Sequence, residues 1–481
     1  MKIEFKQLSV QIGGKQIIEP FDLTIQPDEQ WAFIGTTGSG KTLLAKAIAK
    51  QIFFHGKIDF INEEGSAIDP TIVLIEQHHL FKNKSNVSQF YYQQRFNSAD
   101  AEETMTVEED LKSISIDAKN TWIEKLHIKE ILNKPIIQLS NGENKRLQIV
   151  KAFAQNPDLI ILDNPFVGLD SEGRIALNEI LNGLSAANKR FILITSPQTL
   201  PSCITKVGSI ESGKIHIKNL NECAPWTASY NKIFILPNNI IEQFKKQQSV
   251  QCAFAVRMKN VSIVYNQKQI LKNINWEIKP GERWSLSGHN GSGKSTLVSL
   301  ITADNPQGFA NEIYLFDKLK GTGESIWDIK KNIGFVSPEL HLYFDKGFTA
   351  FETIASGLFD TIGLFKKLNT AQEDSILQWM DLLSITHLKN QYLHQLSLGQ
   401  QRIIMLARAI VKAPPLLILD EPCQGLDSSQ IEFFKQLIDA IASSTDTTMI
   451  YISHFIEDIP SCVNKKLHLE NGVIDDQKSI L

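Results

Sequence analysis

The sequence predicts an α/β protein in which one fold occurs twice, each copy with a mainly parallel sheet covered by helices. Three observations lead to this prediction. The segment KQIIEPFDLTIQPDEQW (residues 15–31) returns without a gap as KQILKNINWEIKPGERW (268–284). A glycine-rich turn lies between an apolar strand and a helix in both halves. Short apolar runs such as LIIL, LLIL, FILIT and MIYIS are bounded by polar turns, as expected of strands buried on both faces of a parallel sheet.

The repeat sets the expected domain boundaries. We predict domains at 1–216 and 256–481, joined by a linker at 217–255 that has no counterpart in the repeat and contains one helix. Such a short tether gives an effective concentration on the order of millimolar. The two halves are therefore expected to pair within one chain.

Composition excludes several classes of protein. The 481 residues carry a net charge of -4, with 42% apolar and 21% charged residues, which gives no basic field for nucleic acid. No apolar run approaches the roughly 20 residues of a membrane span, and the N-terminus lacks the pattern of a signal peptide. We expect a cytoplasmic protein, which docks at the inner face of the plasma membrane if it works there. The cysteines are scattered without metal-binding spacing: Cys203, Cys223, Cys252, Cys423 and Cys462.

Both glycine-rich turns match a phosphate-binding loop. Their glycines allow consecutive backbone N–H groups to surround phosphate oxygens, the helix that follows adds its positive end, and the lysine adds a charge. A tight turn with a surface lysine is the alternative, which two matches in register disfavour. The first loop comprises Gly35, Thr36, Thr37, Gly38, Ser39, Gly40, Lys41 and Thr42, and the second comprises Gly288, His289, Asn290, Gly291, Ser292, Gly293, Lys294 and Ser295.

An aspartate ends an apolar strand in each half, Asp163 after LIIL and Asp420 after LLIL. A carboxylate at this position can hold Mg²⁺ opposite the hydroxyl of Thr42 or Ser295. A cap on the strand end is the alternative. With a phosphate-binding loop upstream in both halves, we predict Mg²⁺ ligands.

Between each loop and its aspartate lies a short motif, LSNGE (139–143) in the first half and LSLGQ (396–400) in the second, and a GLD turn follows each aspartate. In this order, and twice, the motifs resemble those of the ATP-binding cassette ATPases. The resemblance covers almost the whole chain. It implies an ATPase that uses Mg²⁺, in which each cassette has a RecA-like parallel core, an antiparallel β subdomain and a helical subdomain.

The resemblance also implies that the two cassettes pair head to tail. The serine and glycine of one motif, Ser140 and Gly142 or Ser397 and Gly399, would then cap the γ-phosphate held by the other cassette's loop, aided by the start of the helix behind them.

The two expected sites differ in their catalytic residues. In the family, the residue after the metal-binding aspartate activates the attacking water; it is Glu421 in the second half but Asn164 in the first, and Asn cannot accept a proton. The histidine that contacts the γ-phosphate corresponds to His454, but the first half has Pro197 there. We expect Glu421 and His454 to be catalytic and the first loop to bind nucleotide without turnover.

Two other positions also differ. The residue expected to stack on adenine is Tyr265 in the second half and Ile12 in the first. The family's metal-contacting glutamine matches Gln77 in the first half, whereas the second has Pro338, followed by Glu339. Glu339 is interpreted either as a substitute contact or as a solvated loop residue.

The ATPase could drive one of three processes. The segments NPQGF and GESIWDIKKNIGFVS and the tandem layout resemble the molybdate-transport-associated tandem ATP-binding proteins of bacteria, which implies a separate membrane permease but leaves the cargo open. A soluble factor acting on ribosomes and an ATP-gated regulatory protein are the alternatives. The aromatic residues at 89–92 and 327–335 would contact a permease or belong to the subdomain core. The pair His78 and His79 is interpreted as loop surface.

Overall fold

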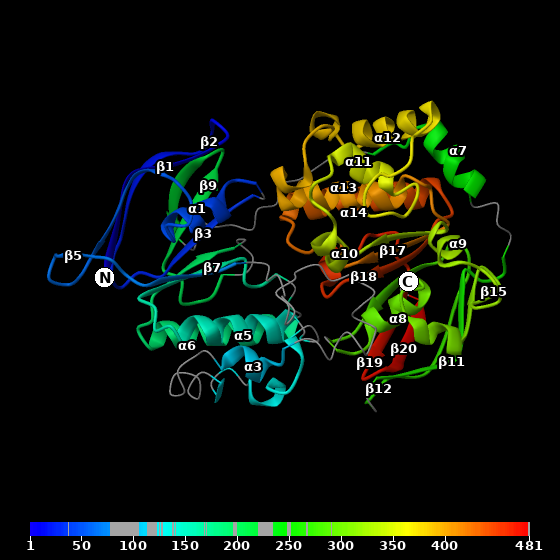
Figure 1. Cartoon of the computed structure of the whole chain (residues 1–481), viewed down its shortest axis with the longest axis horizontal. Helices are drawn as coiled ribbons and strands as arrows, with labels where there is room; N and C mark the ends of the chain where they lie inside the picture. The colour runs from blue at the N-terminus through cyan, green and yellow to red at the C-terminus, as the bar shows by residue number, and fades with distance from the viewer. Residues whose placement is uncertain are drawn as a thin grey trace. The chain divides into compact units, whose positions relative to one another are not determined.

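The structure is a computed structural model with two compact units, one formed by the described residues up to 219 and the other by those from 234 onward. In Figure 1 the first unit runs from blue to green and the second from green to red. The structure describes residues 1–36, 38–76, 105–112, 123–124, 126, 128–136, 139, 141–167, 169, 171–195, 200–219, 234–247, 252–265, 268–289 and 291–479.

The first unit contains two sheets. One is antiparallel, in the order β2-β1-β4-β5; the other has the order β10-β9-β3-β8-β7-β6 and is parallel except for β10. The strands are β1 (Lys2–Ile12), β2 (Lys15–Ile25), β3 (Trp31–Gly35), β4 (His55–Ile61), β5 (Ala67–Ile68), β6 (Ile72–Ile75), β7 (Leu159–Asp163), β8 (Phe191–Ile194), β9 (Lys206–Glu211) and β10 (Lys214–Asn219). The helices include α1 (Lys41–Ile48), α3 (Val107–Leu111), α5 (Asn141–Phe153) and α6 (Ser171–Ala186).

The second unit repeats this arrangement. Its sheets have the orders β12-β11-β14-β15 and β16-β17-β18-β13-β19-β20, the second parallel up to its last pair. Its strands are β11 (Val256–Tyr265), β12 (Lys268–Ile278), β13 (Arg283–Ser287), β14 (Glu312–Leu315), β15 (Lys318–Leu319), β16 (Ile333–Val336), β17 (Leu416–Asp420), β18 (Thr448–Ile452), β19 (Lys465–Glu470) and β20 (Val473–Ser479). Its helices are α7 (Asn238–Gln247), α8 (Lys294–Ile301), α9 (Ile326–Lys330), α10 (Pro338–Tyr343), α11 (Ala350–Ser356), α12 (Thr370–Leu382), α13 (Leu398–Ile410) and α14 (Ser428–Ser444).

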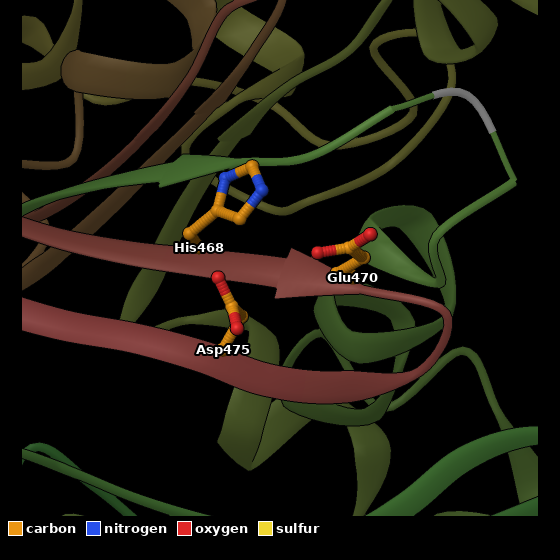
Figure 2. Close-up of side chains that lie close together, drawn as sticks. All are labelled: His468, Glu470 and Asp475. Atoms are coloured by element: carbon orange, nitrogen blue, oxygen red, sulfur yellow. The ribbon is translucent and has the colours of Figure 1, made fainter.

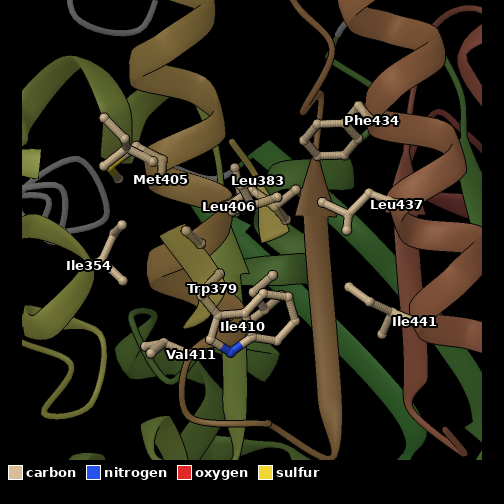
Figure 3. Close-up of a cluster of buried hydrophobic side chains, with 14 of the residues drawn as sticks. Ile354, Trp379, Leu383, Met405, Leu406, Ile410, Val411, Phe434, Leu437 and Ile441 are labelled. Atoms are coloured by element: carbon tan, nitrogen blue, oxygen red, sulfur yellow. The ribbon is translucent and has the colours of Figure 1, made fainter. Parts of the chain in front are cut away.

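The apolar runs form the central strands, as predicted. β7, β8 and β18 are buried along their whole length, because helices cover both faces of a parallel sheet. In the second unit, side chains of α11, α12, α13 and α14 meet in one core around Trp379 (Figure 3). The α/β fold with a parallel and an antiparallel sheet in each half is thereby confirmed.

Part of the segment that we predict as a linker belongs to the core of the second unit. Phe234 packs edge-on against Phe433 with 5.0 Å between ring centroids, and Phe244 of α7 packs against Trp379 at 6.4 Å. Ile240 is fully buried in the same core. Residues 234–247 are thus a folded element of this unit, in which Ile240 and Phe244 lie one helical turn apart on the buried face of α7 and Phe234 precedes the helix.

None of the helices that the structure describes is both long and apolar enough to cross a bilayer.

Candidate active sites

Each phosphate-binding loop connects a parallel strand to a helix. The first runs from the end of β3 to the start of α1, and its lysine, Lys41, donates hydrogen bonds from Nζ to the carbonyls of Gly35 (2.6 Å) and Thr36 (2.8 Å). In the second loop, Lys294 Nζ donates to the carbonyls of Gly288 (2.7 Å) and His289 (2.9 Å). The two lysines therefore have the same place and the same partners, inside their own loops.

The first glycine of each loop is required by a close backbone approach. A Cβ on Gly35 would lie 2.6 Å from the carbonyl oxygen of Ile210 in β9, and one on Gly288 would lie 2.2 Å from that of Leu469 in β19. Both distances are shorter than any contact that a real Cβ makes, and the opposing atoms are backbone. Besides phosphate binding, these glycines allow the loop to pack on the neighbouring strand.

Two of the predicted Mg²⁺ ligands of the first cassette, Thr42 and Asp163, lie together. Thr42 Oγ1 donates to Asp163 Oδ2 at 2.7 Å. Asp163 is buried, and burial raises the pKa of its carboxyl, although the hydrogen bond from Thr42 and the charges of Lys41 and Lys145 act in the opposite direction. A buried carboxylate beside a hydroxyl is a favourable site for a divalent cation. Asp420 ends β17 as Asp163 ends β7, and Ser295 is the second residue of α8 as Thr42 is of α1.

The residue after each aspartate has the same backbone and a different side chain. Glu421 and Asn164 both adopt the left-handed region, with φ of 44° and 46°, and their N–H groups donate to Ile452 and Ile194, at the ends of the adjacent strands. This conformation is costly for a residue other than glycine. The side chain of Glu421 contacts His454, whereas Asn164 Nδ2 donates to Asp163 Oδ1 at 3.2 Å.

Both carboxylate oxygens of Glu421 have a neighbour, but of these two neighbours only Gln424 forms a hydrogen bond. His454 Nε2 lies 2.9 Å from Oε1, and Gln424 Nε2 donates to Oε2 at 2.8 Å. Gln424 in turn accepts a hydrogen bond from Arg402 Nη2 at 3.3 Å. Burial lowers the pKa of the Arg402 guanidinium to about 10, while the charge of Glu421 acts in the opposite direction.

In the first cassette two residues of this chain of contacts are replaced. Val167 occupies the position of Gln424, and Lys145 that of Arg402. Lys145 Nζ donates to the carbonyl of Glu76 at 3.1 Å, and burial lowers the pKa of its ammonium to about 8. Gln424 and Arg402 were not predicted as site residues, although comparing the two halves at these aligned positions would have drawn attention to both.

The LSLGQ motif of the second half (396–400) begins helix α13. Ser397 is the N-cap of α13: Gln400 Oε1 accepts a hydrogen bond from Ser397 N at 2.9 Å, and Ser397 Oγ accepts one from Gln400 N. Gly399 lies so close to Gln430 that a Cβ would fall 2.1 Å from its side chain. In the first cassette, Gly142 lies in the first turn of α5. The positive end of the α13 helix dipole therefore lies at Ser397, where it would attract an anionic group.

Tyr265 is positioned by the antiparallel sheet. It ends β11 opposite Lys268, as Ile12 ends β1 opposite Lys15, so the aligned positions also correspond in structure. Asn305 Nδ2 donates to the hydroxyl of Tyr265 at 2.8 Å, and burial raises the pKa of that phenol.

Pro338 is the first residue of α10, where its missing N–H costs nothing, and Ser337 is the N-cap that accepts from Leu340 N at 3.0 Å. Glu339 lies in the first turn of this helix.

Of the aromatic segment 327–335, Trp327 is 59% exposed, whereas Phe335 packs against the core. Several predicted positions lie outside the described residues: Thr37, Gln77, His78, His79, 89–92, Ser140, Pro197 and Asn290.

Two such loops, each between a parallel strand and a helix, with an aspartate at the end of another strand of the same sheet, define a P-loop ATPase. A family model described as ABC transporter matches residues 18–167 and 271–424. The chain therefore belongs to the ATP-binding cassette family, and it is an ATPase.

Two relatives match over the full tandem. The chain is 31% identical over 476 residues to the ABC transporter ATP-binding protein ModF of Escherichia coli, covering 97% of this chain and 96% of the relative. It is 33% identical over 490 residues to an uncharacterized ABC transporter ATP-binding protein of Schizosaccharomyces pombe, covering 97% and 95%. Among solved structures, the cassette MJ0796 bound to ADP and Pi is similar at 25% identity and a TM-score of 0.41, covering 47% of this chain and 99% of that one.

Proposed function

We propose that this protein is the ATP-hydrolysing subunit of a transport system, with catalysis carried by the second cassette and nucleotide retained without turnover by the first. The observation that carries the proposal is the contrast at one backbone position. Glu421 accepts a hydrogen bond from Gln424 and lies beside His454, whereas Asn164, with the same backbone conformation, is turned toward Asp163.

In the second cassette, Lys294 and the N–H groups of its loop bind the β- and γ-phosphates. Ser295 and Asp420 would hold the Mg²⁺, which would neutralise charge on the phosphates. Glu421 accepts the proton of the attacking water, and the hydrogen bond from Gln424 keeps its carboxylate oriented.

Nucleotide binding by the first cassette is supported by the place of Lys41 inside its loop and by the hydrogen bond of Thr42 to Asp163. The amide of Asn164 cannot take a proton from water. ATP bound here therefore remains bound without hydrolysis and has a structural role.

We further propose that the work is done on a separate membrane permease at the cytoplasmic face of the plasma membrane, with molybdate or a related oxyanion as cargo. The similarity to ModF over the whole chain supports a transport role. The exposed side chains of Ile326 and Trp327 at the start of α9 give the second cassette an apolar surface for such a partner.

The central test is ATP hydrolysis by Glu421→Gln, with Asn164→Ala as the matched control. We expect turnover to fall about 10²- to 10⁴-fold in the first variant, the usual effect of losing a general base, and to stay near wild type in the second. Retention of a third or more of wild-type turnover by Glu421→Gln would refute the assignment of hydrolysis to the second cassette.

The transport role is tested by purifying the full chain from its own membranes. An integral membrane protein that copurifies, and is lost with Trp327→Ala, supports it. Cosedimentation with ribosomes instead would contradict it.

A further inference from the structure

The β19–β20 hairpin of the second cassette carries a cluster that the ATPase mechanism does not use. His468 and Glu470 lie two residues apart on β19, and Asp475 lies on β20. One ligand atom from each lies within 4.8 Å of those of the other two. Figure 2 shows the three side chains directed toward one another on one side of the hairpin.

A β-bulge brings the third residue into this cluster. His468 pairs with Asp476 and Leu469 pairs with Ile474, so Asp475 is an extra residue between two ladder pairs. Bulges re-aim side chains and are frequent beside functional sites. Here the extra residue places a carboxylate next to the imidazole.

The duplicated hairpin in the first cassette is regular, which provides an internal comparison. There Ser209 pairs with His216 and Ile210 pairs with Ile215 without a shift in register. The positions that correspond to His468 and Glu470 are Ser209 and Glu211. Because both hairpins descend from one repeat, the bulge and the histidine distinguish the second copy.

The Nδ1 side of the His468 imidazole is fixed by a hydrogen bond. Its Nδ1 lies 3.0 Å from the hydroxyl of Ser287, the last residue of β13. This leaves Nε2 for an external ligand, and in Figure 2 the outer ring nitrogen is turned toward Glu470. A histidine that binds a metal through one nitrogen commonly has the other one fixed by such a hydrogen bond.

The carboxylates differ in their charge partners between the two copies. Glu211 accepts from Lys218 Nζ at 2.9 Å and from Ser209 Oγ at 2.8 Å, so its charge is compensated. Among the side chains that the structure describes, no lysine or arginine forms an ion pair with Glu470 or Asp475. Two carboxylates and an imidazole are ligand types that together favour a bound cation.

We propose that His468, Glu470 and Asp475 form a binding site for a divalent transition metal, with Zn²⁺ as the representative ion. One nitrogen and two carboxylate ligands, with water in the fourth position, match the ligand types and number that Zn²⁺ accepts, whereas Mg²⁺ and Ca²⁺ prefer oxygen alone. None of the three residues is among the predicted Mg²⁺ ligands of the ATP sites. It stands or falls independently of the proposed function.

The test is equilibrium dialysis of the full chain, freed of nucleotide and metal, against Zn²⁺. The variants are His468→Ala and the double variant Glu470→Gln with Asp475→Asn, which changes only exposed carboxylates and leaves the fold intact. The matched control is His216→Ala, on the corresponding hairpin of the first cassette. We expect both variants to lose one equivalent of Zn²⁺, with affinity at that site lowered more than about 100-fold, and the control to bind as wild type.

Two additional measurements separate this site from adventitious binding. Ser287→Ala is expected to weaken binding about 10- to 100-fold, because it releases the imidazole. With Co²⁺ as the probe, the visible spectrum should lack a thiolate band and should vanish in His468→Ala. The proposal is overturned if His468→Ala and the double variant retain all the Zn²⁺ of wild type, if the lost equivalent shows thiolate ligands, or if Mg²⁺ binds there as tightly as Zn²⁺.

Discussion

Replacing Gln424 by valine, the residue at the same position of the first cassette, tests whether the contacts around Glu421 matter for hydrolysis. The change removes the donor that lies 2.8 Å from Glu421 Oε2 and the acceptor that lies 3.3 Å from Arg402 Nη2. A hydrogen bond to a charged group is worth about 1.5–3 kcal/mol. If this hydrogen bond stabilises the transition state and not the bound substrate, its loss lowers kcat about 10- to 100-fold, because each 1.4 kcal/mol corresponds to about tenfold in rate.

The KM for ATP should change little, because Gln424 contacts the side chain of Glu421 and is not one of the predicted nucleotide-binding residues. A second consequence concerns stability: the guanidinium of Arg402 is fully buried, and losing a partner should cost about 1–3 kcal/mol, which lowers Tm by several degrees. Thermal unfolding checks this separately from activity.

The assay is steady-state phosphate release over a range of ATP concentrations, with Val167→Gln as the matched control. The control should leave kcat unchanged, since Asn164 is no base and gains nothing from an oriented partner. A kcat of Gln424→Val within about twofold of wild type, or a loss confined to KM, would show that Gln424 does not position Glu421.

Three further predictions concern the buried groups. Phe244→Ala should destabilise the second unit by about 3–5 kcal/mol in denaturant unfolding, whereas Ile235→Ala, exposed in the same segment, should not; equal effects would contradict the packing of α7. Lys145 has a folded pKa of about 8 against an ordinary 10.5, so the unfolded chain binds its proton between these values and stability should rise from pH 8 to 10.5; Lys145→Met should remove this rise. The raised pKa of Asp163 means that its contribution to stability is lost as pH rises through that value, so Asp163→Asn should raise Tm at pH 7 without nucleotide and abolish stabilisation by Mg²⁺ with ATP. An unchanged Tm of Asp163→Asn would contradict the cost of burying that carboxylate.

The sequence was informative where a function depends on short, local order. The strand, glycine loop and helix of each half are contiguous, so the positions of Lys41 and Lys294 follow from the chain itself. The difference between Glu421 and Asn164 was also evident from the sequence, because both follow an apolar strand and an aspartate that align without a gap. The fold class and the duplication followed from the same local patterns.

Other features depend on which distant residues the tertiary structure brings together. Arg402 reaches the neighbourhood of Glu421 through its hydrogen bond to Gln424, a contact between residues 22 positions apart that no spacing in the sequence reveals. Residues 234–247 join a core because their apolar face meets α12 and α14, whereas composition alone indicated a linker.

The sequence by itself therefore determined the tandem cassettes, their phosphate-binding loops and the chemical inequality of the two halves. Only the tertiary structure decided what orients Glu421 and what surrounds His468. The reason is physical: a loop is defined by consecutive dihedral angles, but a hydrogen-bond chain or a bulge depends on strand register and helix packing. A shift of one residue in β20 is enough to place Asp475 beside His468.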